Sequence, residues 1–482
     1  MRIEKYHIHC MIGILLMFGF GFLPPFGSVT PMGMKIIGIF LSLVYLWSTV
    51  SIMWPALLGL AALVIVGYTT LGNVLITAFG SEQIVMLIFI LALLGVIDQQ
   101  GVNNYICKWF LTRKVCQKSP WLFLMLWLLA AFFVGLFGNT VFAIFLLWGI
   151  LYQMADVLGV KPFSKFTNAV LVGTVVSAAA GATILPFKDM PIFALALYQQ
   201  MFSGVELPQT VPFIAMMLII AFLTIIGYLL LMRFVFRVDV SCLKTIDLSQ
   251  VESLGNLPAM NGLQKFLLGY MLVFMLFLCV PAFLPTQWLM TIKLKALGSS
   301  GITIVFFALL CLIRRDGKSV VDFQVLSKDK VVWDLIFLMG AGVTVAGALV
   351  SDATGVKTFL AELLTPLLAG CSPFLFVAVL LIAASLVTNF SQNGVTLMLF
   401  MMVGAIFTEQ IAYNTATMVT LLQFCCNMAF VLPSASVMGS ILHGNTGWLK
   451  TKDIYFYTIM TMVMIWFVMI SIGIPLGNVL YR

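Results

Sequence analysis

Two short polar segments interrupt apolar hairpins, and their side chains suit the binding of ions rather than bond-breaking chemistry. The first segment, residues 137–140, contains Asn139, and the second, residues 389–394, contains Asn393. Where a helix is interrupted at membrane depth, the freed N–H and C=O groups are tolerated only if they are buried in protein or line a cavity. The two segments therefore predict a binding site inside the membrane, with the breaks facing each other across it.

Each polar segment is followed by a Leu-Pro break in the next apolar stretch, which makes the arrangement an internal repeat. The breaks are at Pro186, 47 residues after Asn139, and at Pro433, 40 residues after Asn393.

Helices that begin just after the tips present free N–H groups and the positive end of the helix dipole, which favour carboxylates. Unwound carbonyls and hydroxyls near the breaks are oxygen ligands of the kind that sodium needs. The predicted substrate ligands are Asn139, Thr140, Asn393, Gly394 and Lys188, and the predicted cation ligands are Gly138, Thr183, Thr388, Ser391 and Ala429.

Lys188 is the basic residue predicted to lie inside the membrane. An ammonium near the bilayer centre costs at least about 2.5 kcal/mol unless it is paired or hydrated, so such residues are functional candidates. Lys188 could replace a sodium ion electrostatically, or it could hold the substrate directly. Alternatively, it pairs with the adjacent Asp189 or extends into a water-filled vestibule. The tip asparagines could likewise do no more than cap the helices that follow them.

The composition is that of a polytopic membrane protein. Of the 482 residues, 62% are hydrophobic and 9% are charged, whereas ordinary soluble domains carry about a quarter charged residues. The net charge of +8 is explained by basic loops on one side of a membrane, so nucleic-acid binding gains no support. Nine cysteines without paired spacing predict no disulfide framework, and the three histidines are too far apart for a metal site. The apolar run after Arg2 and Lys5 is predicted to be an uncleaved first helix.

Apolar runs of about 20 residues predict membrane spans in both halves of the chain. With the N-terminus in the cytoplasm, nineteen of the 25 Lys and Arg residues fall inside, five fall outside, and Lys188 lies within the membrane. This asymmetry supports the orientation and gives the two repeats opposite directions. Besides the hairpins at 121–157 and 372–410 and the interrupted helices at 166–202 and 413–446, spans are predicted at 9–24, 33–50, 52–69, 82–99, 209–232, 264–286, 299–313, 331–350 and 454–477. The predicted parts are first-half scaffold spans (1–120), a first hairpin and broken helix (121–202), a span and cytoplasmic linker (203–263), second-half scaffold spans (264–371), a second hairpin and broken helix (372–447) and a last span (448–482).

Three stretches resemble the divalent anion:sodium symporters, a permease family that carries dicarboxylates, citrate and sulfate. Residues 33–47, with Gly33, Met34 and Trp47, look like the family's second helix. Residues 333–342 are similar to its W-x-x-x-x-x-x-G-x-G segment, and residues 429–436 resemble its A-F-M-L-P-V-A-T segment. The resemblance implies a homodimer of eleven-span protomers. It also implies a scaffold part and a transport part, built from the hairpins and broken helices, that moves as an elevator.

The chain departs from that family at the tips, where members carry Ser-Asn-Thr twice. Here the first tip keeps Asn139 and Thr140 without the serine, and the second reads Gln392, Asn393 and Gly394. We therefore expect an all-α polytopic carrier with two inverted repeats in a plasma membrane of the bacterial inner-membrane type. It would move small di- or tricarboxylates by anion exchange or sodium symport, with no cofactor other than sodium as a coupling ion. The alternatives are sodium-coupled transport of a sulfate-like oxyanion and, from other classes, an ion channel or a membrane-embedded enzyme.

Overall fold

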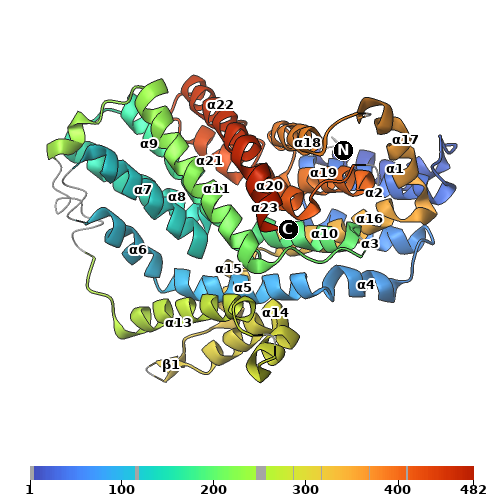
Figure 1. Ribbon diagram of the computed structural model, residues 1–482, viewed down its shortest axis with the longest axis horizontal. Coiled ribbons are helices and arrows are strands. Elements are labelled where there is room, and N and C mark those ends of the chain that lie inside the picture. Colours follow the sequence, from blue (N-terminus) through green and yellow to red (C-terminus); the bar gives the residue numbers. More distant parts are fainter. Residues whose placement is uncertain are drawn as a thin grey trace.

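The structure is a computed structural model that describes residues 5–113, 119–202, 204–245, 257–285, 287–315, 317–368, 370–408 and 411–482. Regular structure in these ranges is helical (Figure 1), apart from two paired two-residue strands, β1 (Arg314–Arg315) and β2 (Lys318–Ser319). Eleven helices within the described ranges are long and apolar enough to cross a membrane. The prediction of an all-α polytopic membrane protein is confirmed.

The helices follow one another in two halves that each contain a hairpin and an interrupted helix. The first half contains α1 (Lys5–Gly19), α2 (Pro31–Thr49), α3 (Met53–Ile65), α4 (Leu71–Phe79), α5 (Glu82–Gln99), α6 (Val102–Leu111), α7 (Pro120–Phe137), α8 (Thr140–Leu158), α9 (Lys165–Ala182), α10 (Asp189–Met201) and α11 (Thr210–Leu230). The second contains α13 (Gly262–Cys279), α14 (Leu289–Cys311), α15 (Phe323–Asp329), α16 (Trp333–Val350), α17 (Val356–Leu368), α18 (Pro373–Val387), α19 (Asn393–Phe407), α20 (Thr415–Asn427), α21 (Val437–Gly444), α22 (Thr451–Val468) and α23 (Ile474–Leu480). Short 3₁₀ or π turns lie at Phe20–Phe22, Leu231–Val235, Ser241–Thr245, Val280–Ala282, Asp352–Thr354 and Met469–Gly473.

Two predicted spans have the wrong extent. The run at 52–69 holds only α3, of 13 residues, because the chain turns at Gly67 (φ 81°) and continues as the separate α4. The span predicted at 299–313 begins ten residues earlier, at Leu289, and is interrupted at Gly298 (φ 64°). Part of the predicted linker, residues 246–256, lies outside the described residues.

The first hairpin is formed by α7 and α8, which meet at Gly138 and Asn139. Pro120 occupies the first turn of α7, where its missing N–H costs nothing. Glycine then allows the backbones of α7 and α9 to touch: a Cβ on Gly135 would overlap the carbonyl oxygen of Ala178, and one on Gly181 would overlap that of Phe132. This contact places the hairpin tip beside the end of α9.

The interrupted helices of the two halves contact each other near their breaks. The α9–α10 helix is non-helical between Ala182 and Asp189, and the α20–α21 helix is non-helical between Asn427 and Val437. On α20, the Asn427 side chain donates to the Ala179 carbonyl at 3.0 Å, and the Gln423 amide donates to the Thr183 carbonyl at 3.3 Å. These side-chain donors satisfy carbonyls that the end of α9 leaves free.

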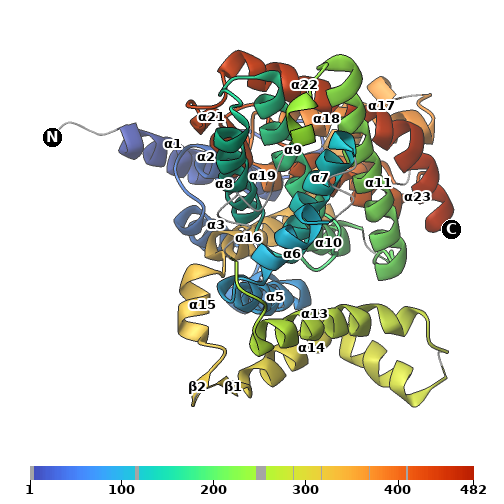
Figure 2. The same ribbon diagram turned by 90° about the vertical axis from the view of Figure 1, so that its left-hand side faces the viewer.

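The apolar helices differ widely in length relative to the membrane. In the second hairpin, α18 and α19 have 15 residues each, about 22 Å, which is shorter than the roughly 30 Å hydrocarbon core. At the other extreme, the continuous helical segments Thr210–Val235 and Thr451–Leu480 have 26 and 30 residues. Figure 2 shows α13 and α14 lying side by side beneath α5 and projecting from the rest of the molecule.

Candidate substrate-binding site

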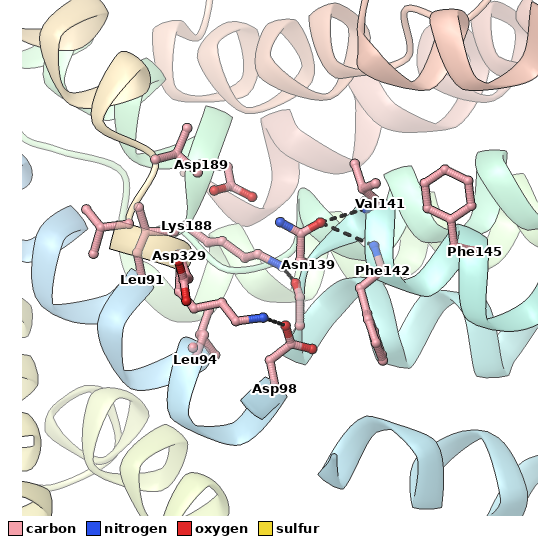
Figure 3. Close-up of a pocket in the computed structure, with 15 residues that line it drawn as sticks. Leu91, Leu94, Asp98, Asn139, Val141, Phe142, Phe145, Lys188, Asp189 and Asp329 are labelled. Carbon is pink, nitrogen blue, oxygen red and sulfur yellow. Dashed lines mark hydrogen bonds and ion pairs between the residues drawn. The ribbon is translucent and has the colours of Figure 1, made fainter. Parts of the chain in front are cut away.

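A cavity of about 500 Å³ lies beside the first hairpin tip (Figure 3). Its walls are α5 from Leu91 to Asp98, the tip and the first two turns of α8, the break before α10, and residues 329–332 at the end of α15 and before α16. Two lysines and three aspartates line it: Lys188, Lys330, Asp98, Asp189 and Asp329. The formal charge of the lining is therefore one negative.

Lys188 is bound to the carboxyl end of α7. Its side chain is only 2% exposed, and its Nζ donates to the carbonyl oxygens of Gly135 at 2.5 Å, Gly138 at 2.6 Å and Leu136 at 3.4 Å. The last carbonyls of a helix lack intrahelical partners and carry the negative end of the dipole, so a cation there is favoured. An ammonium has three N–H groups, and all three are used. These hydrogen bonds fix the amino group of Lys188 to the first hairpin.

Asp189 follows Lys188 in a left-handed conformation. Its φ is 37°, which non-glycine residues adopt uncommonly and aspartate more readily than most. It is the first residue of α10, where a carboxylate is stabilised by the helix dipole, and it lines the cavity. Residues in such rarely adopted backbone conformations are held in place by the surrounding structure, and they are found most often at functional sites.

Asn139 caps α8 with its oxygen, which leaves its nitrogen for the cavity. The Oδ1 atom accepts from the N–H groups of Val141 at 2.8 Å and Phe142 at 3.3 Å. Since one side of the amide is turned to the helix, Nδ2 is directed to the other side, and Figure 3 shows it toward Lys188 and Asp189. The cap and a substrate contact are therefore compatible. Thr140, a predicted substrate ligand and the first residue of α8, does not line the cavity.

Replacing Asn139 by aspartate separates these two roles. Aspartate is as good a cap as asparagine but has no N–H donor and adds a negative charge. We expect N139D to keep the melting temperature of the purified protein within about 2 °C and to reduce anion uptake at least tenfold. N139D uptake equal to wild type would show that Asn139 is only a cap.

The second tip lies away from this cavity. Gln392 caps α19 by accepting from Val395 N–H at 3.1 Å, and the Thr388 hydroxyl lies 3.2 Å from the Asn393 Oδ1. A Cβ on Gly394 would come within 2.8 Å of Leu338 and 3.0 Å of Phe193, so this tip packs against α16 and α10. None of residues 388–394 lines the cavity of the first tip. The structure therefore does not bring the two tips together across one space.

The residues predicted to bind a cation already have protein partners in several cases. The Thr388 hydroxyl donates to the Cys426 carbonyl at 3.0 Å, the Thr183 hydroxyl donates to the Ala180 carbonyl at 2.7 Å, and the Ala429 carbonyl accepts from the Ser436 hydroxyl. The Gly138 carbonyl accepts from Lys188. Ser391, at the second tip, does not line the cavity. Nowhere in the described ranges do three His, Cys, Asp or Glu side chains converge as a metal site.

The two prolines at the helix breaks, Pro186 and Pro433, do not line this cavity. Pro186, with Phe187, lines a separate space of about 160 Å³, whereas Lys188 and Asp189 line the cavity of the first tip. The Pro433 carbonyl accepts from the Ser440 hydroxyl at 2.6 Å, which ties the second break to α21.

Four residues that the sequence did not single out complete the site: Asp98, Asn103, Asp329 and Lys330. The Lys330 ammonium lies 2.6 Å from the Asp98 carboxylate, whose other oxygen accepts from the Asn103 amide at 3.1 Å. A Cβ on Gly138 would lie 2.5 Å from the Asn103 nitrogen, so glycine lets the tip approach this pair. Asp98 had one sequence signal, as an acid near the end of an otherwise apolar span. Asp329 and Lys330 look like ordinary loop charges in the sequence, and Asn103 like a neutral polar residue of a loop.

The fold is shared with two solved transporters. The chain is similar to the YdaH transporter of Alcanivorax borkumensis, with a TM-score of 0.58 and 11% identity over 93% of this chain and 98% of that one. It is also similar to MtrF of Neisseria gonorrhoeae, which represents a class of antimetabolite efflux pumps, with a TM-score of 0.59 and 14% identity over 98% and 95%. No curated protein sequence matches. The family model CitMHS, described as "Citrate transporter", matches residues 42–424, which is most of the chain. This protein therefore belongs to the CitMHS family of membrane transporters.

Proposed function

We propose that the protein is a secondary-active transporter of small di- or tricarboxylates across the plasma membrane. The observation that carries the proposal is the Asn139 amide directed into a cavity beside a buried, fixed ammonium. The amide nitrogen of Asn139 is a donor for a carboxylate, and the positive end of the α8 dipole favours a negative charge in this space of limited hydration. A volume of about 500 Å³ suits a molecule with several carboxylates. A sulfate-like oxyanion, the runner-up, is much smaller than this space.

We propose further that coupling is by anion exchange. Lys188 holds the carbonyls of the first tip that a sodium ion would otherwise use, since carbonyl oxygens are ligands of hard cations. Sodium symport is the alternative, and it requires a cation site elsewhere.

The proposal extends to the orientation of the chain in the membrane and to its assembly. We place the N-terminus in the cytoplasm, from the distribution of basic residues. The hairpins and interrupted helices would form the moving part of each protomer, in inverted repeats. The remaining spans would form a scaffold that pairs with a second copy of the chain.

Uptake of labelled citrate or succinate into proteoliposomes tests both statements. We expect uptake into sodium-free vesicles that are preloaded with unlabelled substrate, at least tenfold above empty vesicles, and little gain from an inward sodium gradient. Protein-free liposomes, loaded in the same way, are the control. If a sodium gradient drives accumulation of the substrate inside the vesicles, the coupling is sodium symport and not exchange. If the protein takes up sulfate but no carboxylate, the proposed substrate class is wrong.

A further inference from the structure

Lys330 reaches the cavity by crossing α5 at a glycine. A Cβ on Gly95 would lie 2.7 and 2.9 Å from the Cβ and Cγ atoms of Lys330, which is closer than real Cβ atoms come. Gly95 therefore leaves room for the aliphatic stem of Lys330 to lie on the helix. The stem leads the ammonium to Asp98, one turn further along α5. This packing fixes where the ammonium enters the cavity.

Of the two lysines that line the cavity, Lys330 has N–H groups to offer a ligand. Lys188 uses its three donors on backbone carbonyls. Lys330 has Asp98 as its hydrogen-bonding partner among the described residues, and 30% of its side chain is exposed. An anion in the cavity can therefore receive hydrogen bonds from Lys330 without displacing any backbone contact.

Asp98 occupies the position at Lys330 that a carboxylate ligand would take. Its side chain is 5% exposed, and the Asn103 amide holds its other oxygen. A carboxylate of the substrate would present the same group to the same ammonium. The two carboxylates compete, because two negative charges held side by side at one ammonium repel each other.

We propose that Lys330 is a substrate-binding residue and that Asp98 is an internal competitor for it, holding the ammonium in place when no substrate is bound. This assignment rests on the proposed function. It makes the substrate class an anion with at least two carboxylates, one at Asn139 and the amino end of α8, the other at Lys330. A monocarboxylate could satisfy only one of these positions.

The opposing explanation is that the Asp98–Lys330 pair only ties α5 to the segment before α16. In that case, removing either partner leaves a charge alone in a partly buried place, and both changes harm the protein in the same way. If Lys330 binds substrate, the two changes have opposite effects on the KM. The sign of the KM change therefore separates the two explanations.

The test is the KM for citrate and for succinate in exchange assays on D98N, K330Q and the double variant D98N/K330Q. We expect D98N to lower the KM at least threefold, because Lys330 is freed from its competitor. K330Q should raise it about tenfold or more. The double variant leaves no unpaired charge, which protects its folding, and should keep the high KM of K330Q. K328Q is the matched control, since Lys328 is exposed, lies two residues away and does not line the cavity.

The possible outcomes are distinguishable. A KM that rises in both single variants, or that is unchanged in K330Q while wild type transports, overturns the role of Lys330 alone. A wild-type protein that exchanges no carboxylate overturns the proposed function and this assignment together. A K328Q variant that behaves like K330Q also overturns the assignment, because the effect would then come from the charge of the loop.

Discussion

Replacing Lys188 by alanine is expected to abolish sodium-free exchange, with a loss of at least about a hundredfold. The change leaves the carbonyls of Gly135, Leu136 and Gly138 without their donor in a buried place. Hydrogen bonds to a charged group contribute about 1.5–3 kcal/mol each, so without them the tip that carries Asn139 is no longer held in its position. The measurement is the initial rate of citrate uptake into preloaded vesicles, normalised to folded protein by size-exclusion chromatography.

Two companion variants identify what Lys188 supplies. K188Q keeps N–H donors for the carbonyls but lacks the charge, so it should fold normally and still not transport. K165A removes an exposed lysine at the start of α9 and should leave uptake unchanged. If Lys188 stands in for a metal ion, sodium added to K188A should restore part of the uptake. Normal exchange by K188A or by K188Q would contradict the role of a fixed cation.

Alanine at Gly135 or Gly181 is expected to prevent folding or to lower the melting temperature by about 10 °C or more. The Cβ of either alanine would overlap a backbone carbonyl, of Ala178 or of Phe132, and a backbone cannot move aside as a flexible side chain can. Forced overpacking in a core costs about 1–3 kcal/mol, and more where the clash is with backbone. Separating α7 from α9 would also displace the carbonyls that hold Lys188.

Gly149 on α8 is the matched control for these glycines. It is helical, and a Cβ there meets no atom within 4 Å. Alanine raises helix propensity by about 1 kcal/mol, so G149A should leave the melting temperature equal or slightly higher. Thermal unfolding in detergent, followed by intrinsic fluorescence, measures all three variants. Stable G135A and G181A proteins would mean that α7 and α9 are less closely packed than the structure has them.

Local patterns in the sequence account for the fold class and much of the helix order. Apolar runs and low charge predict a polytopic α-helical membrane protein, and the resemblance to the anion permeases is confirmed by the match to the CitMHS family. The misplaced boundaries have local causes. The glycine at 67 ends α3 within a run that is apolar throughout, and the lysines at 293 and 295 suggest a loop where α14 has already begun.

The site is less predictable because it depends on which chain segments meet. Asn139 and Lys188 could be chosen from the sequence, since each is a polar residue in an apolar stretch. The choice of Lys330 requires knowing that its stem crosses α5 at Gly95, which no spacing in the sequence reveals. Asn393 looks equivalent to Asn139 in the repeat, yet its tip packs against α10 and α16. The roles of these residues stay predictions that the variants above address.

The unequal helix lengths connect this protein to the thickness of its membrane. Thr210–Val235, at 26 residues, measures about 39 Å and must tilt or thicken a hydrocarbon core of about 30 Å. The same helix is attached to α9 by the Tyr228 hydroxyl, which donates to the Ala169 carbonyl at 2.7 Å. A thinner bilayer increases the tilt of this helix. Because the helix is bonded to α9, the tilt is expected to shift the interrupted α9–α10 helix, in whose break Lys188 lies. We therefore expect the length of the acyl chains around the protein to affect the candidate site.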